Sequence, residues 1–282
     1  MTLSEQITYS TVLIKCKYKD GTTGFGTGFI ANLCDTGENG RFVPVIITNY
    51  HVIKDSIQTE FEFCGADENG NPQDTVAYLI KYSKDKNHWI HHPDPSVDLC
   101  CLTLAELLYE FENSKTRVYF THVDTKIIPS REKLLELSAL EDIVMVGYPI
   151  GISDSYNHKP VIRKGITASH PAKDYQGKKE TLLDIAAFPG SSGSPVFLLN
   201  ESAISTSTGM RFNRQILLLG VLYGGPVFNA QGFLTLASLP NMPVPVTGVP
   251  ANLGVMIKAE RIIEFEPLLK ELAEKAEKTR EN

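Results

Sequence analysis

The 282-residue sequence contains no long hydrophobic run, no block of basic residues and only one tryptophan. No apolar stretch approaches the roughly 20 residues that a membrane-spanning helix requires, so we expect no membrane partner. The net charge is −6 and Lys and Arg do not cluster, which argues against nucleic acid as a partner. Residues 1–6 have neither a basic start nor an apolar segment, so no signal peptide is expected.

Cysteine is also scarce, and the five cysteines have no spacing typical of a disulfide framework. Cys100 and Cys101 are adjacent, so they would point to opposite faces of a strand. We therefore expect free thiols and a cytoplasmic, reducing location.

Short β-rich runs separated by turn signals fill the chain from about residue 8 to about residue 258. Asp20-Gly21 and Gln176-Gly177 are typical of these turns. Many short strands with such punctuation predict an all-β barrel or sandwich, and no regular alternation with helices indicates a parallel sheet. Two stretches within about 103–140 look partly helical, and the apolar residues after Pro267 recur at helical spacing, which predicts a C-terminal helix.

Three short strings carry the chemistry: Thr48-Asn49-Tyr50-His51-Val52, Val97-Asp98-Leu99 and Gly190-Ser191-Ser192-Gly193-Ser194-Pro195. Each alone has an ordinary interpretation, as a strand-end histidine, a surface aspartate and a Gly/Ser turn. Together they run in the order His, Asp, Ser, which is that of chymotrypsin-type triads.

These residues can supply what serine-dependent peptide hydrolysis needs. Ser192 would be the nucleophile, His51 its base and Asp98 the carboxylate that orients the base. The flanking glycines permit backbone conformations that other residues would strain. The backbone N–H groups of Gly190 and Ser192 would form the oxyanion hole.

Several further motifs resemble the trypsin-like serine peptidases, and especially their bacterial HtrA/Deg branch. They are Gly24-Phe25-Gly26-Thr27-Gly28, Thr48-Asn49-Tyr50-His51-Val52, Asp98-Leu99, Val146-Gly147-Tyr148-Pro149 and the segment from Asp184 to Pro195. The resemblance implies two packed six-stranded antiparallel β-barrels with the site between them. The division would be residues 1–140 with His and Asp and an insertion at about 103–140, residues 141–258 with Ser, and a helix at 259–282.

The resemblance also implies how substrate binds. Tyr223, Gly224 and Gly225 match the strand that pairs with substrate main chain, and Ala186 matches the base of the specificity pocket. Gly254 and Met256 would form the facing wall. Because Ala186 carries no acid, we expect a protein or peptide substrate cut after an apolar residue.

Some expectations remain open. Ser191 replaces the aspartate that pairs with a freshly cut N-terminus in digestive relatives, so activation by N-terminal cleavage is not expected, and no PDZ domain is visible. The alternative is a latent or catalytically silent binding module that needs an activating protein partner to form its oxyanion hole. No cofactor or metal is expected, because His88, His91, His92 and Asp94 lack the spacing of a zinc site.

Overall fold

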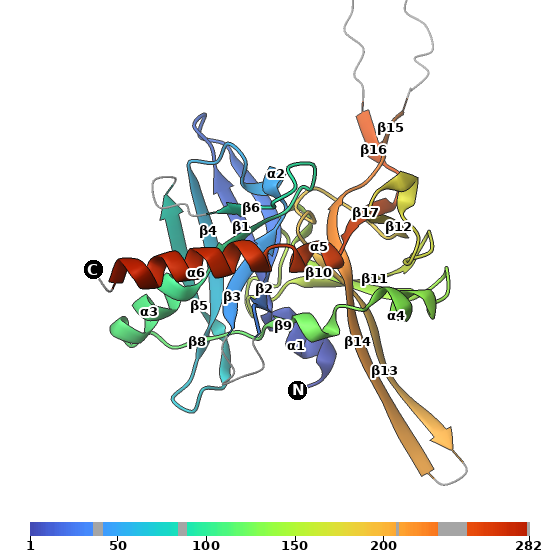
Figure 1. Cartoon of the computed structure of the whole chain (residues 1–282), viewed down its shortest axis with the longest axis horizontal. Coiled ribbons are helices and arrows are strands. Elements are labelled where there is room, and N and C mark those ends of the chain that lie inside the picture. The colour runs from blue at the N-terminus through green and yellow to red at the C-terminus, as the bar shows by residue number, and fades with distance from the viewer. Residues whose placement is uncertain (36–41, 84–88, 207–208, 231–246, 281–282) are drawn as a thin grey trace, which may run out of the picture.

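The chain folds into two β units, and the helices at the C-terminal end lie across them (Figure 1). The computed structural model describes residues 1–35, 42–83, 89–206, 209–230 and 247–280. The first unit contains α1 (Leu3–Tyr9), β1 (Thr11–Lys17), β2 (Thr23–Leu33), β3 (Val43–Thr48), α2 (Tyr50–Ile53), β4 (Gln58–Ala66), β5 (Pro72–Ser83), β6 (Ile90–His91), β7 (Cys100–Thr103), α3 (Ala105–Ser114), β8 (Val118–Tyr119), β9 (Val123–Asp124), η2 (Thr125–Ile127) and α4 (Arg131–Leu135).

The second unit contains β10 (Asp142–Gly147), η3 (Pro149–Gly151), β11 (Val161–Thr167), η4 (Tyr175–Gly177), β12 (Glu180–Asp184), β13 (Pro195–Thr206), β14 (Gly209–Gly224), β15 (Val227–Ala230), β16 (Thr247–Pro250), β17 (Leu253–Lys258), α5 (Glu260–Ile263) and α6 (Glu266–Arg280). Six of its strands close a barrel in the order β10-β11-β12-β17-β14-β13. The far halves of β13 and β14 project from this barrel as a long hairpin (Figure 1).

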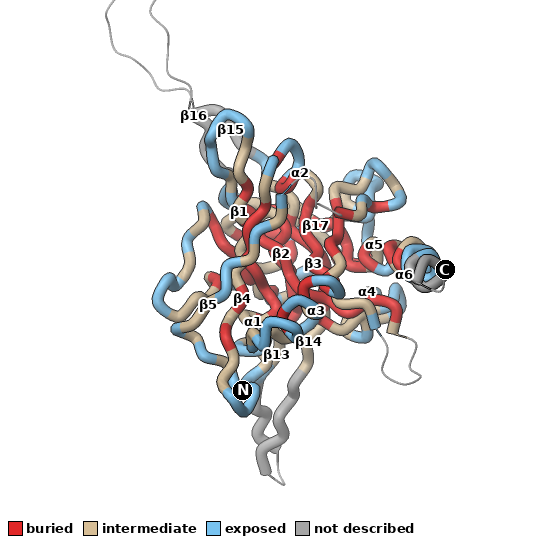
Figure 2. Tube along the Cα trace, turned by 90° about the vertical axis from the view of Figure 1, so that its left-hand side faces the viewer, coloured by how far each residue is buried: buried red, intermediate tan, exposed pale blue. Residues whose placement is uncertain are grey.

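The strands form because apolar residues alternate along them. In β1, Val12, Ile14 and Cys16 are buried and Leu13 and Lys15 are less so, which is the two-residue period of a half-buried strand. Figure 2 shows the buried residues concentrated inside both units.

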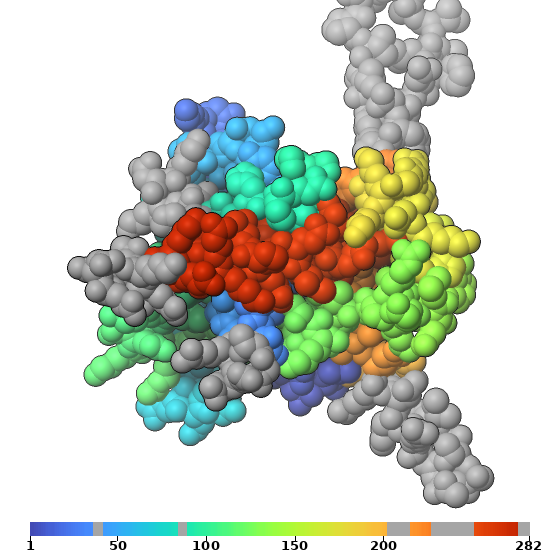
Figure 3. Space-filling view, in the orientation of Figure 1, coloured from blue at the N-terminus to red at the C-terminus, as the bar shows by residue number. Residues whose placement is uncertain are grey.

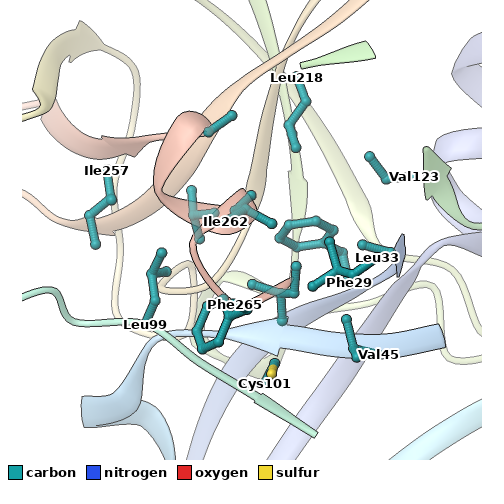
Figure 4. Packing of buried hydrophobic residues seen from close by; sticks show 14 of the residues in the cluster. Phe29, Leu33, Val45, Leu99, Cys101, Val123, Leu218, Ile257, Ile262 and Phe265 are labelled. Carbon is teal, nitrogen blue, oxygen red and sulfur yellow. The ribbon is translucent and has the colours of Figure 1, made fainter. Parts of the chain in front are cut away.

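A shared core joins the two units and the C-terminal helices. Phe29 comes from the first sheet, Leu218 and Ile257 from the barrel, and Phe265 and Leu269 from the C-terminal segment (Figure 4). Figure 3 shows α5 and α6 lying across the face where the two units meet. Each large apolar side chain buried there contributes about 1.5–3 kcal/mol, so the helices help to fix how the two units are placed.

The structure confirms the all-β class, the closed six-stranded barrel and the C-terminal helix. The first unit differs in detail, because its described residues form a nine-stranded sheet in the order β5-β4-β1-β2-β3-β7-β6, with β8 and β9 attached at the side. Its end strands do not pair with each other: β5 pairs with β4, and β6 has only two residues, both paired with β7. No helix in the described part of the chain is long and apolar enough to cross a membrane.

Candidate active site

Pairing between β3 and β7 brings His51 and Asp98 together. In this ladder Thr48 lies opposite Cys100, so the residues just after β3 meet the residues just before β7. His51 then lies on the short helix α2, whose preceding residue Asn49 is fully buried. The Asn49 side-chain amide donates to the Asp98 carbonyl at 2.8 Å and ties the two segments.

Asp98 holds His51 through both carboxylate oxygens. The His51 backbone N–H donates to Oδ1 at 2.9 Å, and Nδ1 of the imidazole is hydrogen-bonded to Oδ2. This arrangement favours the tautomer with the proton on Nδ1, which leaves Nε2 free to accept a proton. The His51 side chain is 45% exposed, so a substrate can reach it.

Ser192 lies on a turn whose shape requires two glycines. Gly190 and Gly193 have φ angles of +85° and +88°, in the left-handed region that other residues disfavour. A Cβ on Gly193 would lie 1.8 Å from the carbonyl oxygen of Thr27, and one on Gly190 would lie 2.6 Å from that of Tyr148. The turn therefore excludes any side chain at either position.

The Ser192 hydroxyl donates to the carbonyl of Tyr223 at 3.3 Å. Within the described residues it makes no hydrogen bond to His51. Catalytic hydrogen bonds are often long or absent before substrate binds, and rotation about χ1 of Ser192 is the change that would redirect the hydroxyl.

The peptide before Gly190 is oriented by a hydrogen bond to η3. The Ile150 N–H donates to the Pro189 carbonyl at 2.6 Å. Because a trans peptide points its C=O and N–H in opposite directions, the Gly190 N–H points away from η3. In the described part of the chain, neither the Gly190 N–H nor the Ser192 N–H donates to a protein acceptor. The turn that carries Ser192 therefore has two unused donors, and binding of an oxyanion needs such donors.

Thr27 connects the first sheet to the serine turn, and sequence reasoning did not identify it. Its hydroxyl donates to the Gly190 carbonyl at 2.9 Å and accepts from the Tyr148 N–H at 3.0 Å. Its backbone N–H donates to the Ser192 carbonyl at 2.9 Å, and its carbonyl accepts from the Thr48 hydroxyl at 2.7 Å. The only sequence signal was a threonine between two glycines in the Gly24–Gly28 run, which is too weak to assign this role.

The expected substrate-binding residues separate into two groups. The Tyr223 carbonyl contacts Ser192, and a Cβ on the next residue, Gly224, would meet open space. Ala186 is half-buried, Gly225 is exposed, and a Cβ on Gly225 would lie 2.2 Å from the Leu253 carbonyl.

Gly254 and Met256 face the barrel interior. A Cβ on Gly254 would lie 2.7 Å from the Leu222 side chain, and Met256 is 1% exposed in the barrel core. Met256 pairs with Leu222 in the β14–β17 ladder. The expected place of Met256 on a wall of the specificity pocket stays a prediction.

A cleft of about 420 Å³ lies beside Asp98 and Tyr223. Val97 and Ile257 give it apolar surface, and its other lining residues are Asp94, Ser96, Asp98, Gly177, Lys178, Lys179, Glu180, Tyr223 and Arg261. Burial and the nearby Glu180 carboxylate raise the pKa of Tyr223 to about 12, so its hydroxyl stays neutral. Of the expected site residues, Asp98 and Tyr223 line this cleft.

The histidines near residue 90 serve structural roles where the structure describes them. The His91 ring packs on Tyr50 with centroids 4.4 Å apart. Nδ1 of His92 accepts from the Asp94 N–H at 3.0 Å, and its Nε2 donates to the Arg261 carbonyl at 3.0 Å. His88 lies outside the described residues, and those that are described contain no cluster of three or more metal-ligating side chains.

Comparisons with known proteins identify a family for this arrangement. A sequence model of the trypsin-like peptidase domain matches residues 26–204. No curated protein sequence matches the chain.

Solved structures of proteases are similar at low identity. The active form of the Rv3671c protease from M. tuberculosis is 15% identical, with 92% of this chain and 80% of that chain covered and a TM-score of 0.45. The MamO protease domain from Magnetospirillum magneticum is 12% identical, with 93% and 97% covered and a TM-score of 0.44. The serine endoprotease from Yersinia pestis is 15% identical, with 96% and 64% covered and a TM-score of 0.43.

Proposed function

Because the chain belongs to the trypsin-like peptidase domain family, we propose that it is a serine endopeptidase with His51, Asp98 and Ser192 as its triad. The observation that carries the proposal is that Asp98 binds His51 through both carboxylate oxygens, while the turn that carries Ser192 has two unused N–H donors, those of Gly190 and Ser192. A nucleophile, a base, an orienting carboxylate and an oxyanion site are the four parts that acyl transfer by serine needs.

In the proposed mechanism, the Ser192 Oγ attacks the substrate carbonyl while Nε2 of His51 takes its proton. The negative charge that develops on the carbonyl oxygen is bound by the N–H groups of Gly190 and Ser192. His51 then protonates the leaving amine, and a water molecule attacks the acyl-enzyme with His51 again acting as base. Asp98 stabilises the imidazolium in both halves of the reaction.

The proposed substrate is a protein or peptide that is cleaved after an apolar residue. Ala186 offers no carboxylate to a basic side chain at the expected pocket base. Substrate main chain would pair along Tyr223 and Gly224, where a Cβ on Gly224 would meet open space. A peptide library in which cleavage after Lys or Arg dominates would contradict this preference.

The five cysteines support a cytoplasmic site of action, because all of them are free thiols. Cys16, Cys34, Cys100 and Cys101 are buried, and burial raises the pKa of each of these thiols. Free thiols persist in a reducing compartment.

One observation favours a second candidate, a latent module that needs an activating protein partner. The Ser192 hydroxyl is hydrogen-bonded to the Tyr223 carbonyl in place of His51. An enzyme that rests in this state would require a partner or a substrate to redirect the hydroxyl.

Labelling with a fluorophosphonate probe tests both candidates, because the probe reacts with activated serines. Wild-type protein should be labelled and the Ser192→Ala variant should not. Absence of labelling in both proteins would contradict the endopeptidase proposal and support the latent module.

A further inference from the structure

Arg163 reaches under the serine turn from β11. It lies opposite Met145 in the β10–β11 ladder, and its side chain is directed to the segment that follows β12. One terminal nitrogen of its guanidinium, Nη1, donates to the carbonyl of Ala186. The other, Nη2, donates to the Ser191 hydroxyl at 2.8 Å.

This guanidinium has no acidic partner in the part of the chain that the structure describes. Arg261, by contrast, pairs with Asp94 at 2.5 Å and with Glu264 at 2.9 Å. The Nε atom of Arg163 is buried without an acceptor, and burial lowers the pKa of the group to about 10. It therefore remains charged at neutral pH, although a buried cation without a counter-ion is costly.

The two acceptors of Arg163 lie at the two ends of one functional segment. The segment begins at Ala186 and ends at Ser191. The Gly190 N–H, a candidate oxyanion donor, lies within it, and the second candidate donor, the Ser192 N–H, follows directly after it. Ser191 is fully buried, and its backbone is held by hydrogen bonds from Ser191 N–H to Phe188 at 3.0 Å and from Ser194 N–H to Ser191 at 3.0 Å.

A planar guanidinium is suited to this task because its donors are fixed in a fork. A single rigid group that binds both ends of a segment restricts their separation, which a flexible ammonium cannot do. The glycine at position 190 makes the segment easy to deform, since it has no side chain to restrict its backbone.

We propose that Arg163 is a positioning residue that clamps the segment from Ala186 to Ser191, and so keeps the Gly190 and Ser192 N–H groups aimed at the oxyanion. This inference rests on the proposed peptidase function. The clamp consists of the two hydrogen bonds from the guanidinium, to the Ala186 carbonyl and to the Ser191 hydroxyl. Arg163 itself makes no contact with substrate.

The experiment measures the rate of inactivation by a fluorophosphonate for four proteins: wild type, Arg163→Met, Arg163→Lys and Arg163→Ala. A misplacement of about 1 Å costs on the order of 10²-fold in rate, so we expect a loss of about that size in Arg163→Met. Arg163→Lys should recover only part of it, because one ammonium cannot span both acceptors. Thermal unfolding shows that each variant is folded at the assay temperature.

Added guanidinium ion separates positioning from general destabilisation. Guanidinium weakens folded proteins, so a variant that is merely destabilised should lose activity when it is added. Arg163→Ala should instead gain activity at concentrations well below the unfolding range, with sodium chloride at equal ionic strength as the control. Removal of the Ser191 hydroxyl provides a second test, because Ser191→Ala in the Arg163→Met background should cause little further loss.

Each outcome bears on a distinct claim. If wild-type protein is labelled and Arg163→Met is labelled at the same rate, the clamp is overturned and the peptidase proposal stands. If Arg163→Ala is slow but guanidinium slows it further, Arg163 is structural only and the inference also falls. If wild-type protein itself is not labelled, the peptidase proposal fails and the clamp falls with it.

Discussion

Substitution of Thr27 by valine should damage both stability and activity, because one hydroxyl connects the two units at the serine turn. Valine keeps the shape of threonine but removes the donor to the Gly190 carbonyl and the acceptor for the Tyr148 N–H, at 2.9 and 3.0 Å. Thr27 is fully buried and Tyr148 nearly so, so water does not readily replace the lost partner.

The structure sets the size of both effects. A buried polar group left without a partner costs about 1–3 kcal/mol, so two of them should lower the free energy of unfolding by about 2–6 kcal/mol. Release of the Gly190 carbonyl also frees the Gly190–Ser191 peptide, which lies between the two peptides that carry the Gly190 and Ser192 N–H donors. Loss of one oxyanion donor typically reduces kcat by about 10²–10³-fold, which bounds the expected loss in probe reactivity.

The assay compares urea unfolding and fluorophosphonate inactivation for wild type, Thr27→Val and Thr27→Ser. Serine keeps both hydrogen bonds and loses only a methyl group, so it should cost about 1 kcal/mol and little reactivity. Equal inactivation rates for wild type and a folded Thr27→Val would refute the reasoning. So would a serine variant as impaired as the valine variant.

Three further outcomes follow from the site. Gly193→Ala should abolish labelling and strongly destabilise the fold, because its Cβ would lie 1.8 Å from a backbone oxygen at a φ of +88°; urea unfolding measures this. Asp98→Asn should slow inactivation by about 10⁴-fold in a folded protein, and a loss under tenfold would contradict the triad. Hydrogen bonds from Ser96, and then Arg261, lower the pKa of Asp94 from 3.8 to about 2. The stability that Asp94 adds is thus complete above about pH 4 and lost toward pH 2. In acid unfolding, the free energies of unfolding at these two pH values should therefore differ less in Asp94→Asn than in the wild type.

The local strings around His51, Asp98 and Ser192 were readable because each sits at the end of a strand or between glycines. How His51 and Asp98 are brought together was not predictable, because it depends on the pairing of Thr48 with Cys100 in a ladder between distant strands. Thr27 and Arg163 were missed for the same reason: their hydrogen bonds cross from one strand to a segment far along the chain.

A register shift in β14 lies next to the candidate site. Side chains alternate faces along a strand, so one inserted residue exchanges the core and cleft faces. The irregularity between Leu222 and Gly224 is such an insertion in β14, and the string Leu222-Tyr223-Gly224-Gly225 gives no sequence signal that predicts it. The same irregularity leaves the Tyr223 carbonyl available to the Ser192 hydroxyl.

Besides the direction of the Ser192 hydroxyl, one peptide bears on the choice between the two candidate functions. Thr27, Ile150 and Arg163 come from three segments, and each binds a carbonyl or hydroxyl of the serine loop. Only Ile150 binds a peptide that carries one of the N–H donors: it holds the Pro189 carbonyl, so the planar peptide sets the direction of the Gly190 N–H. A latent form that lacks the oxyanion hole would have to turn the Pro189 carbonyl away from Ile150, which reverses the Gly190 N–H. Ile150 holds that carbonyl from a left-handed conformation, φ 54° and ψ 26°, which costs a β-branched residue about 1–2 kcal/mol. The hydrogen bond that orients the Gly190 N–H is therefore donated by a residue, Ile150, whose own backbone is strained.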